Sequence, residues 1–263
     1  MGMKLDVGVK NLPKDIKLGD VIVPEELKNR RKTGCDWYDR VLGNGGAVPS
    51  AVTMFTGTPG AGKTTAFLQI ADAASKNPEH VVLYNTGEES VFQTAMVRDR
   101  LRIAGNFHVQ QYQLLKDLLE HMDALKREHP SKVVWVFHDS LQTLDDGKWK
   151  DGVNPMTAVR CTEALVEWNK KNYGLVTFIG QVKKDGKFAG KQTIAHAIDV
   201  HAHLCIDEKK KSETYGERLL QVNKNRYGAT GITMVMGMGV DGLFVKGTIG
   251  EHLDSIGVAE SSD

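Results

Sequence analysis

Four runs of mainly apolar residues divide the first two thirds of the chain, and longer mixed segments separate them. The runs occupy 51–57 (AVTMFTG), 81–87 (VVLYNTG), 132–140 (KVVWVFHDS) and 175–182 (LVTFIGQV). Nearly continuous apolar runs of this length are typical of strands that are buried on both faces of a sheet. We therefore expect these runs to be the central strands of the fold.

Apolar residues recur at helical spacing in the segments between the runs. Helices are expected at 63–75, from 89 to about 103, at 114–128 and at 156–171. Strands that alternate with helices predict an α/β fold, in which a mostly parallel central sheet is flanked by helices on both faces.

The pattern is different toward both ends of the chain. Short apolar segments separated by turns predict antiparallel C-terminal strands, at 203–207, 218–223, 232–236 and 243–245. Residues 1–32 form a polar lead that could contact another subunit, and the small acidic segment 251–263 is expected to be frayed. The expected organisation is a lead at 1–32, a core at 33–250 and a tail at 251–263.

Composition narrows the possible partners and compartments. The chain has 34 Lys and Arg against 33 Asp and Glu, so contact with nucleic acid would depend on local basic clusters. The three cysteines lie far apart and form no CxxC pair, which gives no support to a zinc ribbon. No apolar run is long enough to cross a membrane and no signal-peptide core is present, so we expect a cytoplasmic protein without a membrane partner.

The segment between the first strand and the first helix fits a phosphate-binding loop. Gly57, Gly62, Lys63 and Thr64 match the spacing G-x-x-x-x-G-K-[ST], in which backbone N–H groups and a helix N-terminus surround phosphate oxygens. Lys63 would reach the β- and γ-phosphates, and the Thr64 hydroxyl would ligate Mg²⁺. The residues expected to bind ATP are Gly57, Thr58, Pro59, Gly60, Ala61, Gly62, Lys63, Thr64 and Thr65.

Three further carboxylates lie at or just after the ends of predicted strands. Asp139 ends an apolar strand, where an aspartate that holds Mg²⁺ is found in such proteins. Glu88 and Glu89 follow the strand at 81–87, and a carboxylate there could polarise the attacking water. We expect Glu88 to be the base, although Glu89 remains the alternative. Asp139 could instead only cap a turn, and Glu89 could serve only the first turn of a helix.

Two loops combine lysines with an aromatic residue. Lysines can contact phosphates and an aromatic ring can stack on a base, as in proteins that bind single strands. The alternative for each loop is a solvated polar turn. The candidates are Lys148, Trp149 and Lys150 in the first loop, and Lys183, Lys184, Lys187, Phe188 and Lys191 in the second.

These motifs in this order resemble the RecA-like ATPases, and within them the RadA/Sms branch. The most discriminating block is 224–228 (KNRYG), which looks like a lysine–asparagine–arginine–aromatic–glycine signature of that branch. The resemblance covers about residues 17 to 240. The other matching stretches are 33–34 (TG), 40–43 (RVLG), 57–64 (GTPGAGKT), 86–90 (TGEES), Gln93, 98–101 (RDRL), 138–143 (HDSLQT), 180–190 (GQVKKDGKFAG) and 195–199 (AHAID).

The resemblance implies assembly as a ring or filament on DNA, with ATP bound between neighbouring subunits. Lys224 and Arg226 match signature residues that reach the phosphates of an adjacent subunit's nucleotide; the alternative is that they only complete a polar strand end. Gln181 matches the position that senses the γ-phosphate, where this branch often has histidine. Each subunit would supply Lys63 and Glu88 to its own nucleotide.

The resemblance further implies an ATP-dependent motor of DNA recombination or repair that binds single-stranded DNA, forms homo-oligomers and works with other recombination or replication proteins. The alternatives are a replicative-type hexameric helicase and a DNA-independent, protein-binding ATPase. RadA usually carries an N-terminal four-cysteine zinc module and a C-terminal protease-like domain. Because no cysteine precedes Cys35 and little chain follows the core, we expect a core without these two modules.

Overall fold

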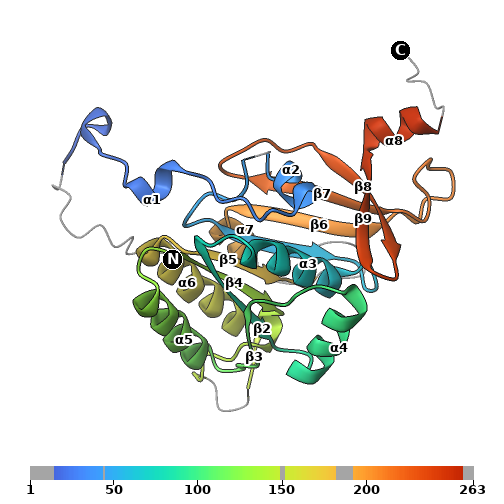
Figure 1. The fold of residues 1–263 in the computed structure, drawn as a ribbon. Helices are drawn as coiled ribbons and strands as arrows, with labels where there is room; N and C mark the ends of the chain where they lie inside the picture. The colour runs from blue at the N-terminus through green and yellow to red at the C-terminus, as the bar shows by residue number, and fades with distance from the viewer. Residues whose placement is uncertain (1–14, 44, 149–151, 182–191, 257–263) are drawn as a thin grey trace.

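The computed structural model describes residues 15–43, 45–148, 152–181 and 192–256. Within these residues a nine-stranded sheet forms the centre of the molecule (Figure 1), in the order β3-β2-β4-β5-β1-β6-β7-β8-β9. The strands are β1 Val52–Gly57, β2 His80–Thr86, β3 His108–Gln110, β4 Val133–Asp139, β5 Leu175–Ile179, β6 Val200–Ile206, β7 Arg218–Asn225, β8 Thr233–Gly239 and β9 Gly242–Thr248.

Helices cover both faces of the parallel part of this sheet, as the sequence predicts (Figure 1). One face packs a core around Phe55, Phe67 and Phe137, whose rings meet edge to face. The other face packs Met54 and Phe178 among residues of α5 and α6. The helices are α1 Glu25–Lys28, α2 Asp36–Val41, α3 Lys63–Ser75, α4 Val91–Leu101, α5 Leu115–Glu128, α6 Pro155–Asn172, α7 Gln192–Ala197 and α8 Ile249–Ser255, with 3₁₀ turns η1 Leu18–Asp20 and η2 Leu141–Thr143.

Strand β6 differs from its prediction in both position and direction. It begins at Val200 and pairs parallel with β1, whereas β7, β8 and β9 extend the sheet antiparallel as expected. Its residues alternate between apolar side chains on one face, such as Ala202, and His201 and His203 on the other. The two imidazoles interrupt the apolar run, so the sequence pattern shows only the second half of the strand.

Helix α8 includes residues 251–255 of the segment that was expected to be frayed, and residues 257–263 lie outside the described residues. Thr248 accepts a hydrogen bond from the backbone N–H of Glu251, and the Glu251 carboxylate accepts one from the N–H of Thr248. This capping box satisfies two donors at the helix N-terminus. The pattern T-x-x-E at 248–251 therefore indicates a helix start, although the acidic, small-residue composition of the segment suggests a frayed end.

The lead contributes little to the core among its described residues. Turn η1 and helix α1 bury no side chain, and Figure 1 shows them in blue, apart from the main body. The chain joins the body at Arg31, which forms a two-way backbone pair with Ala47. No helix in the described part of the chain is both long and apolar enough to cross a membrane.

Candidate nucleotide site

The loop between β1 and α3 has the conformation that its glycines predict. Gly60 and Gly62 have φ of +75° and +102°, a region that L-residues rarely adopt. A Cβ on Gly57 would lie 2.2 Å from the carbonyl oxygen of Leu204 in β6, so the loop can pass this strand only with glycine there. The loop therefore depends on its glycines for both backbone conformation and close packing.

The loop borders a cavity of about 620 Å³ at the carboxyl ends of the parallel strands. Open α/β sheets bind ligands at this edge. The lining residues come from the loop and the start of α3, from the ends of three central strands, from α4 and from the antiparallel extension. They are Gly57, Pro59, Gly60, Gly62, Lys63, Thr64, Thr65, Glu88, Arg100, Asp139, Ile179, Gln181, Arg218 and Met238.

Lys63 lies folded into the loop. Its Nζ donates to the carbonyl oxygens of Gly57 and Thr58, at 3.1 and 3.2 Å. Burial lowers the pKa of this amine, and the nearby carboxylates of Asp139 and Glu88 act in the opposite direction. The ammonium thus lies where an incoming phosphate could replace weak carbonyl acceptors with anionic oxygens.

Asp139 lies at the end of β4, beside the first residues of α3. The Thr64 hydroxyl donates to its Oδ2 at 2.7 Å, and the Tyr84 hydroxyl lies 3.4 Å from the same oxygen. Burial raises the pKa of Asp139 to about 6, while the Thr64 hydrogen bond opposes that shift. The structure therefore places together the two residues that the sequence assigns to the metal.

The donor set fits Mg²⁺. A hydroxyl and a carboxylate are hard oxygen donors, and Mg²⁺ takes one or two protein ligands while phosphates and water supply the rest. Consistent with that division, the described residues contain no group of three or more His, Cys, Asp and Glu that could enclose a metal. Thr64 and Asp139 would hold the ion on the protein side.

The structure separates the two adjacent glutamates. Glu88 lines the cavity, and its Oε1 accepts a hydrogen bond from the Ser140 hydroxyl at 2.5 Å. Glu89 is not among the residues that line the cavity, and its backbone carbonyl accepts a hydrogen bond from the Thr86 hydroxyl just before α4. Because only Glu88 faces the space that a nucleotide would occupy, its position favours it as the base.

Gln181 also lies at this edge. It follows β5, is exposed and lines the cavity. The preceding residue, Gly180, donates its N–H to the Phe55 carbonyl at 2.9 Å, which fixes the end of β5 against β1. Gln181 is thus held beside the phosphate loop, at the position from which a terminal phosphate could be sensed.

Lys224 and Arg226 lie near the start of the parallel strand β6, whereas the phosphate loop of the same subunit follows the end of β1. Lys224 pairs with His201 near the start of β6, and its Nζ donates to the carbonyls of Ala195 and Ile198, at 2.8 and 2.6 Å. Arg226 forms an ion pair of 2.9 Å with the fully buried Asp199. Neither residue lines the cavity of its own subunit.

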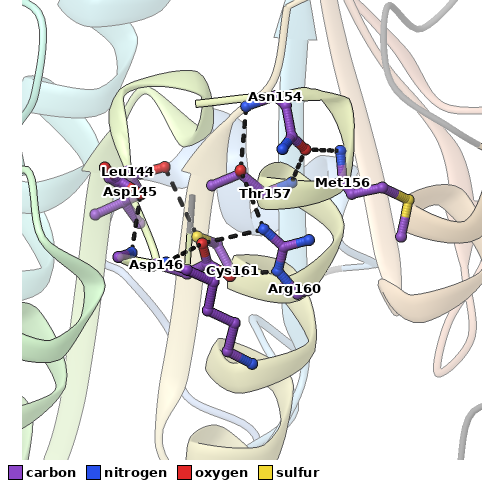
Figure 2. A network of polar contacts seen from close by, with 10 residues as sticks. Leu144, Asp145, Asp146, Asn154, Met156, Thr157, Arg160 and Cys161 are labelled. Atoms are coloured by element: carbon purple, nitrogen blue, oxygen red, sulfur yellow. Dashed lines mark hydrogen bonds and ion pairs between the residues drawn. The ribbon is translucent and has the colours of Figure 1, made fainter. Parts of the chain in front are cut away.

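Most of the candidate DNA residues lie outside the described residues: Trp149, Lys150, Lys183, Lys184, Lys187, Phe188 and Lys191. Lys148 is described and exposed. The ends of its loop are fixed by a polar network (Figure 2), in which Asp146 pairs with Arg160 of α6 and Asn154 caps the same helix. The first lysine loop is therefore anchored on both sides.

Several residues at the site were not predicted from the sequence. Arg100 and Arg218 bring two cations into the cavity from α4 and β7, and Ser140 holds Glu88. The Thr56 hydroxyl, next to the loop, lies 2.7 Å from His201 Nε2 and 2.8 Å from His203 Nδ1. The available signals were the family-like stretches 98–101 and 138–143, which carry Arg100 and Ser140 but indicate no role.

No family model matches the chain. The DNA repair protein RadA of Escherichia coli K12 is 33% identical over 238 residues, which is 90% of this chain and 48% of that protein. RadA of Haemophilus influenzae is 34% identical over 215 residues, 81% of this chain and 44% of that protein. The chain thus spans about half the length of the curated relatives that it matches.

Solved structures show the same fold. The KaiC-like protein PH0186 of Pyrococcus horikoshii OT3 superimposes with a TM-score of 0.67 and 15% identity, covering 82% of this chain and 98% of that one. A second solved structure, an isolated ATPase domain, gives a TM-score of 0.70 and 16% identity, covering 83% and 92%. The chain therefore has the RecA-like ATPase fold and is a homologue of the part of RadA that it matches, which confirms the resemblance first seen in its motifs.

Proposed function

We propose that this chain hydrolyses ATP in a DNA recombination or repair motor, binding single-stranded DNA and completing its ATP sites at subunit interfaces. The observation that carries the proposal is the cavity in which the phosphate loop, the Thr64–Asp139 pair and Glu88 meet. Homology to proteins named for DNA repair supports the DNA part. Strand exchange, annealing and branch migration are all compatible with it.

Within this proposal each residue of the cavity has a separate task. Loop N–H groups and the Lys63 ammonium bind the β- and γ-phosphates. Mg²⁺, when bound, neutralises charge that develops on the transferring phosphoryl group. Glu88 accepts a proton from the attacking water, and Ser140 orients the carboxylate by its hydrogen bond. Gln181 contacts the γ-phosphate from the end of β5.

Lys224 and Arg226 are proposed to act on a neighbour's nucleotide. Their position at the amino ends of the parallel strands supports this role, because from there they cannot contact a nucleotide bound at the phosphate loop of their own subunit. In the present conformation both are occupied within the subunit, by two carbonyls and by Asp199. Assembly must therefore exchange these contacts for phosphate oxygens, or the residues only complete the strand end.

ATP turnover with and without single-stranded DNA tests the proposal. The motor is expected to hydrolyse ATP slowly alone and faster with single strands. Turnover that DNA leaves unchanged would favour a protein-binding ATPase instead, while strand separation of a forked duplex would favour a hexameric helicase. A chain that neither binds nor hydrolyses ATP would refute the proposal as a whole.

A further inference from the structure

Arg218 places a guanidinium in the cavity although its strand lies two positions away from β1. Its Nε–H donates to the carbonyl oxygen of Ala61, in the phosphate loop, at 3.0 Å. The side chain is half-buried and lines the cavity. Strand β7 reaches the loop because it pairs with β6, where Arg218 lies opposite Ile206, just beyond the end of β1.

The rest of this guanidinium is free to bind a ligand. Arginine has five N–H donors in a planar fork, of which Arg218 uses one on Ala61. Within the described residues no acceptor takes the other four. Arg100, the second arginine in the cavity, differs because its Nη groups already donate to Val240 and Thr65. A planar fork with free donors matches phosphate oxygens.

The order of the strands indicates which phosphates Arg218 would reach. Glu88 and Gln181 follow β2 and β5, on one side of β1, whereas Arg218 begins β7 on the other side. Lys63 and the loop lie between these two groups. If the terminal phosphate lies beside the base and the sensor, the opposite end of the cavity faces the part of the nucleotide that is not transferred.

We propose that Arg218 binds the phosphates nearer the nucleoside, in the nucleotide site of its own subunit. This inference rests on the proposed function, because it requires a nucleotide in the cavity. Such a contact is equally strong in the ground state and in the transition state. Its loss therefore weakens binding without slowing the chemical step, so KM rises while kcat is preserved.

Binding of a fluorescent ADP derivative to the full chain in the presence of Mg²⁺ tests this contact. Arg218→Gln should raise the Kd for ADP by roughly ten- to a hundredfold, as expected for lost hydrogen bonds to a charged group. Displacement by inorganic pyrophosphate, which has no nucleoside, should weaken by a similar factor. The matched control is Lys246→Gln, which removes a cation of β9 that pairs with Glu217 outside the cavity.

Arg218→Lys separates charge from loop support, because lysine keeps the cation and loses the Nε–H that Ala61 accepts. It should recover part of the ADP affinity, because the cation is kept and the planar fork is lost. If the lysine variant binds as weakly as Arg218→Gln, the arginine acts only through the loop and the proposed contact is wrong. Unchanged pyrophosphate displacement would also overturn it.

Three further outcomes are decisive. An Arg218→Gln protein with wild-type thermal midpoint and wild-type ADP affinity would refute the Arg218 contact and leave the proposed function intact. A wild-type chain that binds no ADP would refute the proposed function and the inference with it. Where the Gln variant hydrolyses ATP, a reduced kcat with unchanged KM would place Arg218 in the chemical step, against the proposal.

Discussion

The Thr64 hydroxyl and the Asp139 carboxylate form a hydrogen bond of 2.7 Å across the gap between α3 and β4. Both are candidate Mg²⁺ ligands, and in this arrangement Asp139 is buried with its pKa raised to about 6. Burial thus opposes ionisation of the carboxylate that the metal needs. Stability and metal binding make opposite demands on this one side chain.

Asp139→Asn should stabilise the nucleotide-free protein and remove its Mg²⁺ response. A carboxyl whose folded pKa lies near 6 rather than 3.8 destabilises the fold once it ionises, so its replacement should gain on the order of 1–3 kcal/mol at pH 7. Thermal unfolding measures the gain, and ADP binding with and without Mg²⁺ measures the loss. A variant less stable than wild type would contradict the argument.

Mg²⁺-dependent nucleotide binding should weaken as the pH falls through about 6. Below that pH Asp139 is protonated in the folded chain, and Mg²⁺ must displace the proton in order to bind. The measurement is the Kd for ADP with Mg²⁺ between pH 5 and 8, compared with the Kd for ADP without the metal. Equal pH profiles with and without Mg²⁺ would exclude Asp139 as the group responsible.

Glu88→Gln should preserve ATP binding and abolish hydrolysis, because it removes only the acceptor for the proton of water. A general base contributes typically 10²–10⁴-fold to a rate, so turnover should fall by about that factor. Glu89→Gln is the matched control, since this neighbour does not line the cavity. If the Glu89 variant loses turnover and the Glu88 variant keeps it, the two assignments must be exchanged.

Neutralising Lys183, Lys184 and Lys187 together should weaken binding to single-stranded DNA and flatten its salt dependence. Each lost phosphate contact removes a slope of about −0.7 from a plot of log K against log salt. Phe188→Ala should cost roughly 1–3 kcal/mol if the ring stacks on a base. An unchanged salt slope would move the DNA site to the anchored loop that carries Lys148.

Mixing two inactive variants tests whether Arg226 acts across an interface. A Lys63→Ala subunit lacks the lysine that binds the phosphates of its own nucleotide. An Arg226→Ala subunit lacks only the arginine that would contact the nucleotide of its neighbour. In mixed oligomers some Arg226→Ala subunits would receive an intact arginine, so ATP turnover should partly return. Mixed oligomers that form and remain inactive would show that Arg226, paired with Asp199, is confined to its own subunit.

The central strands and the phosphate loop could be predicted because their signals are local. A strand buried on both faces is apolar throughout, and the loop has a fixed spacing of glycines and lysine. Asp139 and Glu88 could be placed because each lies at or just beyond the end of such a strand. In a parallel sheet the carboxyl ends of strands share one edge, so chain position alone brings these residues together.

The remainder depends on partners distant in the chain. Nothing around Arg218 indicates that β7 lies two strands from β1, because strand order is set by long-range pairing. The direction of β6 was missed for the same reason, and its two histidines shortened the apparent strand. The family-like stretch 138–143 contains Ser140 but does not indicate its role, because that role depends on a glutamate 52 positions earlier in the chain.

Strand β7 begins with Arg218 and has Lys224 as its seventh residue, so about 20 Å of extended strand separates the two cations. If Lys224 and Arg226 reach the next subunit, each copy of β7 contacts two nucleotides: that of its own subunit near Arg218, and that of the neighbouring subunit near Lys224. The strand pairs with β6 from Arg218 to Asn225, and with β8 over its first four residues, so its two ends are mechanically linked. Loss of a phosphate at one end would then shift the cations at the other, so neighbouring subunits would hydrolyse ATP in sequence and not independently.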